Sequence, residues 1–216
     1  LGISDDNDVP TINSVEGNTV DSLVDTPTNY GSDTGAGGEV RGNYATLNPL
    51  DRQSTNGTLS NGNLDLTSTG TNWAFYRSTM FVSSGKWYWE CTIGNNQYTT
   101  IGICSAAYQM ASTTSAWANY STEMFGFYPY NGSIYNGGNT ISYTTADQTA
   151  SGSVIGVALD MDAGTLTYYK NGTSLGVATS TLAGKNISPT HWLYQHSGIG
   201  NADAYNFGQR AWVHTP

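Results

Sequence analysis

The stretch VIGVALDMDAGTLTYYKNGTSLGVA, residues 154–178, decides the fold of this chain. Two turn sequences, DAGT at 162–165 and Asn-Gly at 171–172, bracket the short run LTYYK. Asn-Gly is the strongest short hairpin signal, because both residues tolerate the positive φ that a tight turn requires. Alternation along the middle run places Leu166 and Tyr168 on the same face. The stretch therefore predicts a three-stranded antiparallel meander.

The same alternation of short strands and turns continues through the rest of the chain. No amphipathic run is long enough to predict a helix. The predicted strands cover residues 58–61, 63–68, 73–81, 86–93, 99–104, 124–130, 153–160, 165–172, 174–178, 192–197 and 204–208. Their spacing of about 8 to 15 residues is typical of an antiparallel sandwich rather than of a parallel α/β sheet. We therefore predict an all-β domain, an antiparallel β-sandwich, over residues 43–216.

The composition restricts the partners that this chain can bind. Charged residues make up only 11% of the 216 residues, and 16 acids against 7 bases leave a net charge of −9. A negative chain is repelled by nucleic-acid phosphates and by anionic membranes. No apolar run approaches the roughly 18 residues that a membrane-spanning helix needs. We therefore expect no nucleic-acid partner and no membrane insertion.

The front of the chain differs from the rest. Clusters of Gly, Pro, Asp and Asn with little apolar periodicity predict an extended N-terminal segment, a linker or connector, over residues 1–42. The chain starts without Met, and its first ten residues lack the basic and apolar regions of a signal peptide. We expect it to be part of a longer polypeptide.

Several blocks in the second part of the chain resemble the SPRY/B30.2 family. They are GKWYWECTI at 85–93, TIGIC at 100–104, the opening stretch at 154–178 and YNFGQ at 205–209, in the order of the family's own blocks. ATLNPLD at 45–51 is similar to the lead segment of the longer B30.2 form. The resemblance implies a sandwich of two twisted antiparallel sheets, with loops at one end forming a shallow binding surface. It also implies protein recognition rather than catalysis.

A second resemblance concerns the flanks of the domain. The segments at 21–50 and 205–216 are similar to stretches that flank SPRY domains in structural proteins of bacteriophages, especially marine ones. This similarity implies a virion structural protein.

Candidate catalytic carboxylates have structural explanations. Glycoside cleavage needs two carboxyl groups about 5 to 10 Å apart, and Asp160 and Asp162 form the best pair by sequence. Both flank a hairpin turn, where Asp is favoured because it caps its own backbone. Glu90 lies inside an aromatic strand and is expected to be hydrogen-bonded, while Glu123 precedes another strand without a second acid at a telling spacing. We therefore expect that this chain is not an enzyme.

Two groups of metal-binding residue types occur. Asp5, Asp6 and Asp8 offer dense oxygen ligands for calcium, with a solvated linker as the alternative. His191 and His196 lie five residues apart, on opposite faces of a predicted strand, so shared zinc ligation is not expected. We expect these histidines to be solvated or at the edge of the core. Calcium is the only candidate cofactor, and we expect no other.

The two cysteines are too few for a disulfide scaffold. Cys91 shares a strand face with Ile93, whereas Cys104 lies opposite the face of Ile101 and Ile103. If both isoleucine faces form the core, the thiols point apart and a disulfide is not expected. We expect two free, buried thiols.

Aromatic residues supply the remaining functional signal. Residues 106–121 and 128–143 are rich in Tyr, Trp and Asn, which predicts loops. Tyr and Trp offer large contact areas at low entropic cost, as binding loops require. The candidate ligand-binding residues are Tyr108, Trp117, Tyr120, Tyr130 and Tyr135, with Trp192 and Tyr194 at the rim. The alternative is packing on the flank of the sandwich, which we expect for about half of the loop aromatics.

These observations favour a non-catalytic module of a tail fibre or capsid appendage, at the virion surface. Its expected partner is a host surface protein, a glycan or a neighbouring virion subunit. Alternatives are a polysaccharide-degrading enzyme on a similar sandwich and a purely architectural decoration protein. Fibre proteins are often trimers, so a homotrimer is a candidate assembly, although no heptad repeat supports it.

Overall fold

The computed structural model describes most of the second part of the chain. The described residues are 44–69, 73–94, 98–109, 121–146, 149–194 and 202–214. The predicted connector at 1–42, with the calcium candidates Asp5, Asp6 and Asp8, lies outside them, as does its boundary with the domain. Within the described ranges, no helix is long and apolar enough to cross a membrane.

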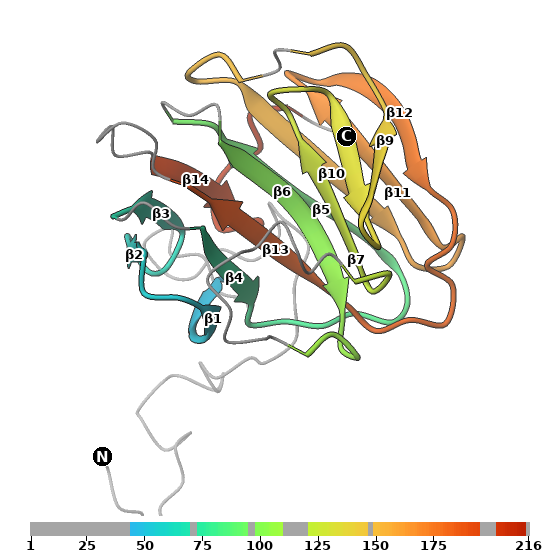
Figure 1. Ribbon diagram of the computed structural model, residues 1–216, viewed down its shortest axis with the longest axis horizontal. Helices are drawn as coiled ribbons and strands as arrows, with labels where there is room; N and C mark the ends of the chain where they lie inside the picture. Colours follow the sequence, from blue (N-terminus) through green and yellow to red (C-terminus); the bar gives the residue numbers. More distant parts are fainter. Residues whose placement is uncertain are drawn as a thin grey trace, which may run out of the picture. The chain divides into compact units, whose positions relative to one another are not determined.

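Two seven-stranded sheets form the fold, and all the strand pairs in them are antiparallel (Figure 1). The first sheet has the spatial order β1 (Leu47–Gln53), β4 (Ala74–Ser78), β13 (Ile187–Leu193), β6 (Thr99–Ser105), β7 (Met124–Tyr128), β8 (Ser133–Asn136), β9 (Asn139–Ser142). The second has the order β12 (Thr173–Thr179), β11 (Thr165–Lys170), β10 (Val154–Asp160), β5 (Lys86–Thr92), β14 (Ala202–Asn206), β3 (Asp65–Ser68), β2 (Gly57–Ser60). The prediction of an all-β antiparallel sandwich is confirmed.

The meander predicted from the opening stretch is β10, β11 and β12. Asp160 pairs with Thr165 across the first turn. In the second turn, Asn171 and Gly172 adopt φ values of 46° and 79°, the left-handed region that such a turn requires. The local sequence therefore sets the geometry of this part of the second sheet.

The main core lies between the two sheets. Alternation along each strand turns one apolar row inward, such as Ile101 and Ile103 on β6 and Leu166 and Tyr168 on β11. These four side chains are fully buried.

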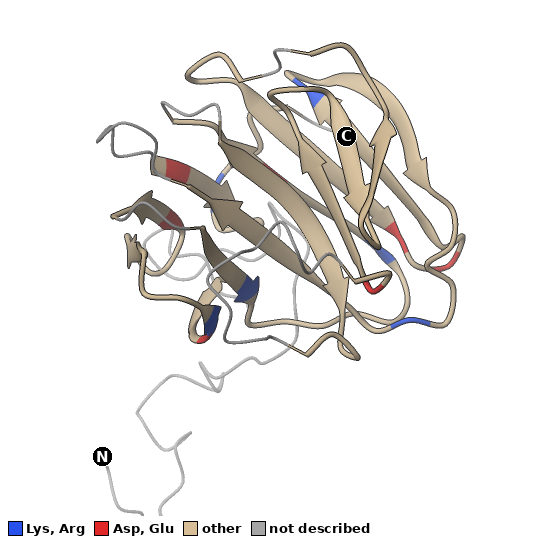
Figure 2. Ribbon diagram, in the orientation of Figure 1, with Lys and Arg blue, Asp and Glu red and all other residues tan. Residues whose placement is uncertain are grey.

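Figure 2 shows that charged residues are few and scattered over the described strands and turns, without a basic stretch.

The structure corrects the predicted loop at 128–143, which contains the hairpin β8–β9. Gly137 and Gly138 form its turn with φ values of 58° and 77°. All four residues of β9 are exposed at the edge of the sheet. A short polar edge strand has no apolar alternation, so the sequence pattern did not reveal it.

The structure also extends the strand predicted at 192–197. β13 begins at Ile187, five positions earlier, and includes Pro189. Proline is rare within sheets because it cannot donate a ladder hydrogen bond. The pairing of β13 with β4 covers Thr190 to Leu193, so Pro189 lies just outside that ladder.

Candidate functional site

A second apolar cluster lies on the face of the first sheet that points away from the main core. On β6, Ile101 and Ile103 face the second sheet, so Cys104 points to the opposite side. The members of this outer aromatic cluster are Trp73, Phe75, Cys104, Tyr108, Met124, Tyr128, Tyr135 and Trp192, with Tyr98 and Tyr194 packed against them. The sandwich therefore has an apolar layer outside the first sheet as well as inside it.

Trp192 occupies the centre of this cluster because the neighbouring strand carries a glycine. A Cβ added at Gly102 would lie 3.0 Å from the Trp192 ring and 2.3 Å from the carbonyl oxygen of Phe125. On its other side, Trp192 packs against Phe75, with ring centroids 4.5 Å apart. Trp192 is only 1% exposed. Its expected place at the rim of a binding site is therefore wrong, and it is a packing residue.

At one end of the first sheet, five rings form a continuous array that we call the aromatic end: Trp73, Tyr98, Tyr128, Tyr130 and Tyr194. Tyr98 directly precedes β6, and Tyr194 directly follows β13. Since the two strands are antiparallel neighbours, these positions meet, and the Tyr194 N–H donates to the Tyr98 carbonyl at 3.1 Å. The end of β7 brings Tyr130 to the same place.

Ring contacts connect this array from one side to the other. Centroid distances are 5.4 Å for Trp73 and Tyr194, and 5.7 Å for Tyr98 and Tyr194. Tyr98 and Tyr130 are stacked at 6.0 Å, with an interplanar angle of 27°. Tyr128 is 5.8 Å from Tyr130. The arrangement is a row of aromatic rings in mutual contact.

Exposure separates contact residues from supporting ones within the aromatic end. Tyr130 is 40% exposed, and Tyr98 and Tyr194 are partly exposed. Trp73 and Tyr128 are buried. Burial raises the pKa of Tyr128, and the neighbouring tyrosines add to the effect. Among the described residues, Tyr98, Tyr130 and Tyr194 therefore contribute the solvent-exposed rings of the aromatic end.

Five of the seven predicted ligand-binding residues gather on this one face of the first sheet. Tyr108, Tyr135 and Trp192 are buried members of the cluster, while Tyr130 and Tyr194 belong to the aromatic end. The other two, Trp117 and Tyr120, lie outside the described residues. For Tyr108 and Tyr135, as for Trp192, burial leaves packing as the role that the geometry allows.

Sequence reasoning missed Trp73 and Tyr98. Trp73 is the first residue of the strand predicted at 73–81, and Tyr98 directly precedes the strand predicted at 99–104, so a search for aromatic residues at strand ends would have found both. That search could not have shown that the two strand ends meet. The order β4, β13, β6 brings together segments that are far apart in the sequence.

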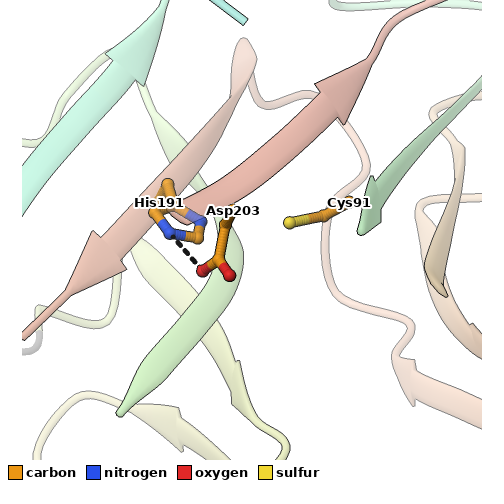
Figure 3. Close-up of side chains that lie close together, drawn as sticks. All are labelled: Cys91, His191 and Asp203. Atoms are coloured by element: carbon orange, nitrogen blue, oxygen red, sulfur yellow. Dashed lines mark ion pairs between the residues drawn. The ribbon is translucent and has the colours of Figure 1, made fainter. Parts of the chain in front are cut away.

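A buried polar network connects the two sheets and is composed of Cys91, Thr99, His191, Asp203 and Tyr205. Figure 3 shows three of its members, Cys91, His191 and Asp203. The Nε2 atom of His191 is 3.1 Å from the Oδ2 atom of Asp203. The Thr99 hydroxyl donates to the same oxygen at 2.6 Å. The other ring nitrogen of His191 lies 2.7 Å from the Tyr205 hydroxyl. All of these side chains are buried.

One assignment of protons satisfies the whole network. Asp203 accepts from the Gly94 N–H at 2.9 Å and from Thr99, so its remaining contact requires a proton on His191 Nε2. The Nδ1 atom of the ring then accepts from the Tyr205 hydroxyl. This tautomer follows from the hydrogen-bond partners. The expectation that His191 is solvated or at the core edge is wrong, because it lies fully buried against this carboxylate.

The network contains residue types that also occur in catalytic triads and in zinc sites. The donor atoms of Cys91, His191 and Asp203 lie within 4.8 Å of one another, and they are nitrogen, oxygen and sulfur ligands of the zinc type. However, they are already bonded to each other and to their neighbours. Burial, followed by the charge of Asp203, raises the pKa of Cys91 well above 9.0. Thr99 and His191 in the first sheet both bond to Asp203 in the second, so the network links the two sheets.

The two cysteines are free and buried, as predicted. Cys91 belongs to the main core and Cys104 to the outer aromatic cluster. Burial raises the pKa of Cys104 to about 12.

At the first meander turn, Asp160 caps its own turn as predicted, whereas Asp162 bonds to the backbone of a segment far away in the sequence. Asp160 accepts from the N–H groups of Asp162 and Ala163 at 3.1 and 2.9 Å, and it pairs with Lys86 at 3.1 Å. The Ala163 N–H and then Lys86 hold the pKa of Asp160 below its usual value. Asp162 accepts from the Gly85 N–H at 2.8 Å. Both acids therefore accept hydrogen bonds from backbone N–H groups.

The remaining candidate acids are also engaged. Glu90 accepts from the N–H groups of Val213 and His214 at 2.9 and 2.8 Å, so its expected hydrogen-bonded role is confirmed. Glu123 accepts from Lys185 at 2.8 Å and from Ser105 at 2.5 Å. These bonds lower the pKa of Glu123, with Lys185 contributing most.

Comparison with known proteins identifies the family. A family model of the SPRY domain matches residues 86–206, more than half of the chain, and the chain belongs to this family. The structure is similar to the SPRY domain of human HERC1, with a TM-score of 0.61 and 21% identity, covering 76% of this chain and 99% of that one. The PSpry domain of TRIM65 gives a TM-score of 0.58 at 18% identity, covering 76% and 89%.

A third similar structure is stonustoxin, with a TM-score of 0.58 and 22% identity. The match covers 76% of this chain and 27% of the stonustoxin chain. At these identities the structural likeness shows the fold alone. SPRY domains are generally non-catalytic modules that bind other proteins.

Proposed function

We propose that this chain is a recognition module of a bacteriophage particle, and that it binds a host surface molecule through the aromatic end. The observation that carries this proposal is the meeting of Tyr98, Tyr130 and Tyr194 at the ends of three strands, with Tyr130 40% exposed. Solvent-exposed aromatic rings on a rigid scaffold are typical anchors of binding surfaces. Family membership supports recognition rather than catalysis.

The chemistry of the aromatic end suits a weakly charged partner. Tyrosine rings offer flat apolar area together with a hydroxyl group, and they contribute contact area at low entropic cost. The chain's net charge of −9 disfavours acidic ligands. A neutral glycan or an exposed apolar segment of a host protein fits both features.

The virion setting rests on the resemblance of residues 21–50 and 205–216 to segments of phage structural proteins. It places the module at the virion surface, in a tail fibre or capsid appendage, with a homotrimer as the candidate assembly. We retain Asp5, Asp6 and Asp8 as candidate calcium ligands. Light scattering with and without a calcium chelator tests both the assembly and the ion.

A glycan array, read with the purified chain, tests the proposed ligand. We expect specific signals that Tyr130→Ala reduces, since this substitution removes the most exposed ring of the aromatic end. The matched control is Phe81→Ala, because Phe81 is 38% exposed and follows β4 at the opposite end of that strand. Equal losses in both variants would contradict a role for the aromatic end. Release of reducing ends would favour the enzymatic alternative.

A second candidate function is docking to a neighbouring virion subunit. Leu50 is 94% exposed, and the next residue, Asp51, binds Arg77, whose guanidinium lies 5.4 Å from the Phe81 ring. This places exposed apolar side chains around an ion pair at the end of β4 away from the aromatic end. For this function the variants reverse their roles: Phe81→Ala should impair assembly into particles, and Tyr130→Ala should not.

A further inference from the structure

We infer that Asp203 is a positioning residue of the aromatic end: its buried carboxylate holds the chain segments from which Tyr98 and Tyr194 project. The consequence for binding rests on the proposed function. The inference about the geometry of the aromatic end is independent of the proposed function.

The carboxylate of Asp203 connects three other segments. Its Oδ1 atom accepts from the N–H of Gly94, just after β5. Its Oδ2 atom accepts from the hydroxyl of Thr99, the first residue of β6, at 2.6 Å. The same oxygen lies 3.1 Å from His191 on β13. One side chain on β14 therefore joins the adjacent ends of strands from both sheets.

The two tyrosines follow directly from these anchors. Tyr98 is the neighbour of Thr99, and Tyr194 is three residues beyond His191. The Tyr194 N–H donates to the Tyr98 carbonyl, so the two segments are also bonded to each other. A shift of either anchor is therefore transmitted to both rings.

Complete burial makes the carboxylate an effective anchor. Asp203, Thr99 and His191 have no exposed surface. Hydrogen bonds to an ionised group are roughly twice as strong as neutral ones, and water cannot replace a donor that is lost.

A glycine permits this close approach. A Cβ at Gly94 would lie 1.6 Å from the carbonyl oxygen of Ala202, the residue before Asp203. Only glycine lets the backbone at position 94 come close enough for its N–H to reach the carboxylate.

Three variants distinguish the positioning of Tyr98 and Tyr194 by Asp203 from a contribution of Asp203 to the stability of the whole domain. Thr99→Val keeps the shape of the side chain and removes one donor to Asp203. Asp203→Ala removes all three connections. Asp203→Asn keeps an acceptor for Gly94, and its NH₂ group can donate to His191 once the imidazole carries its proton on Nδ1. The Asn variant therefore keeps the connection to Gly94 unchanged and reverses the direction of the connections to Thr99 and His191.

Amide hydrogen exchange of the full chain provides the test without any ligand. We expect Thr99→Val to accelerate exchange at the N–H groups of Gly94 and Tyr194 by about tenfold or more, and to leave the N–H groups of β11 unchanged. The Tyr194 N–H should exchange more slowly in the Asp203→Asn variant than in the Asp203→Ala variant. If the Ala variant does not fold, Thr99→Val decides alone, with Thr190→Val as the matched control, because the Thr190 hydroxyl is buried and has no hydrogen-bond partner.

The possible results are distinct. Unchanged exchange at Tyr194 in Thr99→Val, or equal acceleration in β11, would overturn the proposal. On the glycan array, Thr99→Val should weaken the signals that wild-type protein gives, and faster exchange with unchanged signals would overturn the link to binding. An array without wild-type signals would contradict the proposed function, while the exchange results would still decide whether Asp203 positions the two tyrosines.

Discussion

Of two isosteric substitutions on neighbouring strands, one should lower the stability of this domain and the other should not. Thr99 and Thr190 are both fully buried in the first sheet, on β6 and β13. The hydroxyl of Thr99 donates to Asp203 at 2.6 Å, whereas that of Thr190 has no partner. Replacing either residue by Val exchanges a hydroxyl for a methyl group of similar size, so the difference between the two variants isolates the hydrogen bond.

The magnitudes follow from the partners. Thr99→Val removes a hydrogen bond to a charged group, which contributes about 1.5–3 kcal/mol. Thr190→Val removes a buried, unpaired hydroxyl, whose desolvation penalty is about 1–3 kcal/mol, so this variant should be as stable as wild type or about 1 kcal/mol more stable. For a domain of this size, each kcal/mol shifts the melting temperature by about 2–4 °C.

Urea unfolding followed by tryptophan fluorescence measures both effects. The midpoint should fall for Thr99→Val and remain equal or rise for Thr190→Val, with the dependence of the free energy on urea unchanged. Thr100→Val provides a second control, because the Thr100 hydroxyl is also buried without a partner. Equal losses of stability in all three variants would refute the reasoning, since shape and not hydrogen bonding would then decide the outcome.

Three further measurements test the assignments of the site. Trp192→Ala should lower the free energy of unfolding by about 3–5 kcal/mol, because it empties the centre of the outer aromatic cluster, whereas Tyr130→Ala should cost less than about 1 kcal/mol; similar losses would mean that Tyr130 is a core residue. A thiol reagent at neutral pH should leave Cys91 and Cys104 unmodified in the folded protein and titrate both after unfolding, since burial raises the pKa of each thiol; a missing thiol after unfolding would contradict their free state. The pKa of Glu123 is lowered from 4.5 by its hydrogen bonds, so its contribution to stability is complete above that value and is lost as the pH falls through the lowered pKa. Glu123→Gln should therefore weaken the acid dependence of urea unfolding between about pH 3 and pH 7, and an unchanged dependence would argue against this ion pair.

Much of the fold could be predicted because turn chemistry and alternation are local. Asn171 and Gly172 adopt the positive φ values that their types predict, and the run between the turns buries Leu166 and Tyr168 as alternation requires. The strands that escaped prediction have weak local signals. All residues of β9 are exposed, so no alternation distinguishes it from a loop.

The candidate site could be predicted only in part, because residue type does not determine exposure. The sequence indicated Tyr130 as a loop contact residue and Trp192 as a rim residue, yet the first is 40% and the second 1% exposed. The difference arises from Gly102 on a neighbouring strand, which leaves the space that the indole fills. Tyr98 was missed for a related reason, since its importance depends on the strands beside it.

The sequence by itself determined the antiparallel meander, the all-β class and the opposite orientation of Cys91 and Cys104. These features depend on φ preferences and on the two-residue period of a strand, which act between near neighbours. The tertiary structure alone decided the aromatic end and the network around Asp203. Thr99 and His191 lie 104 and 12 positions before Asp203, and they meet because non-consecutive strands pair within one sheet and a second sheet packs on it. Such contacts depend on strand order, which no local pattern encodes.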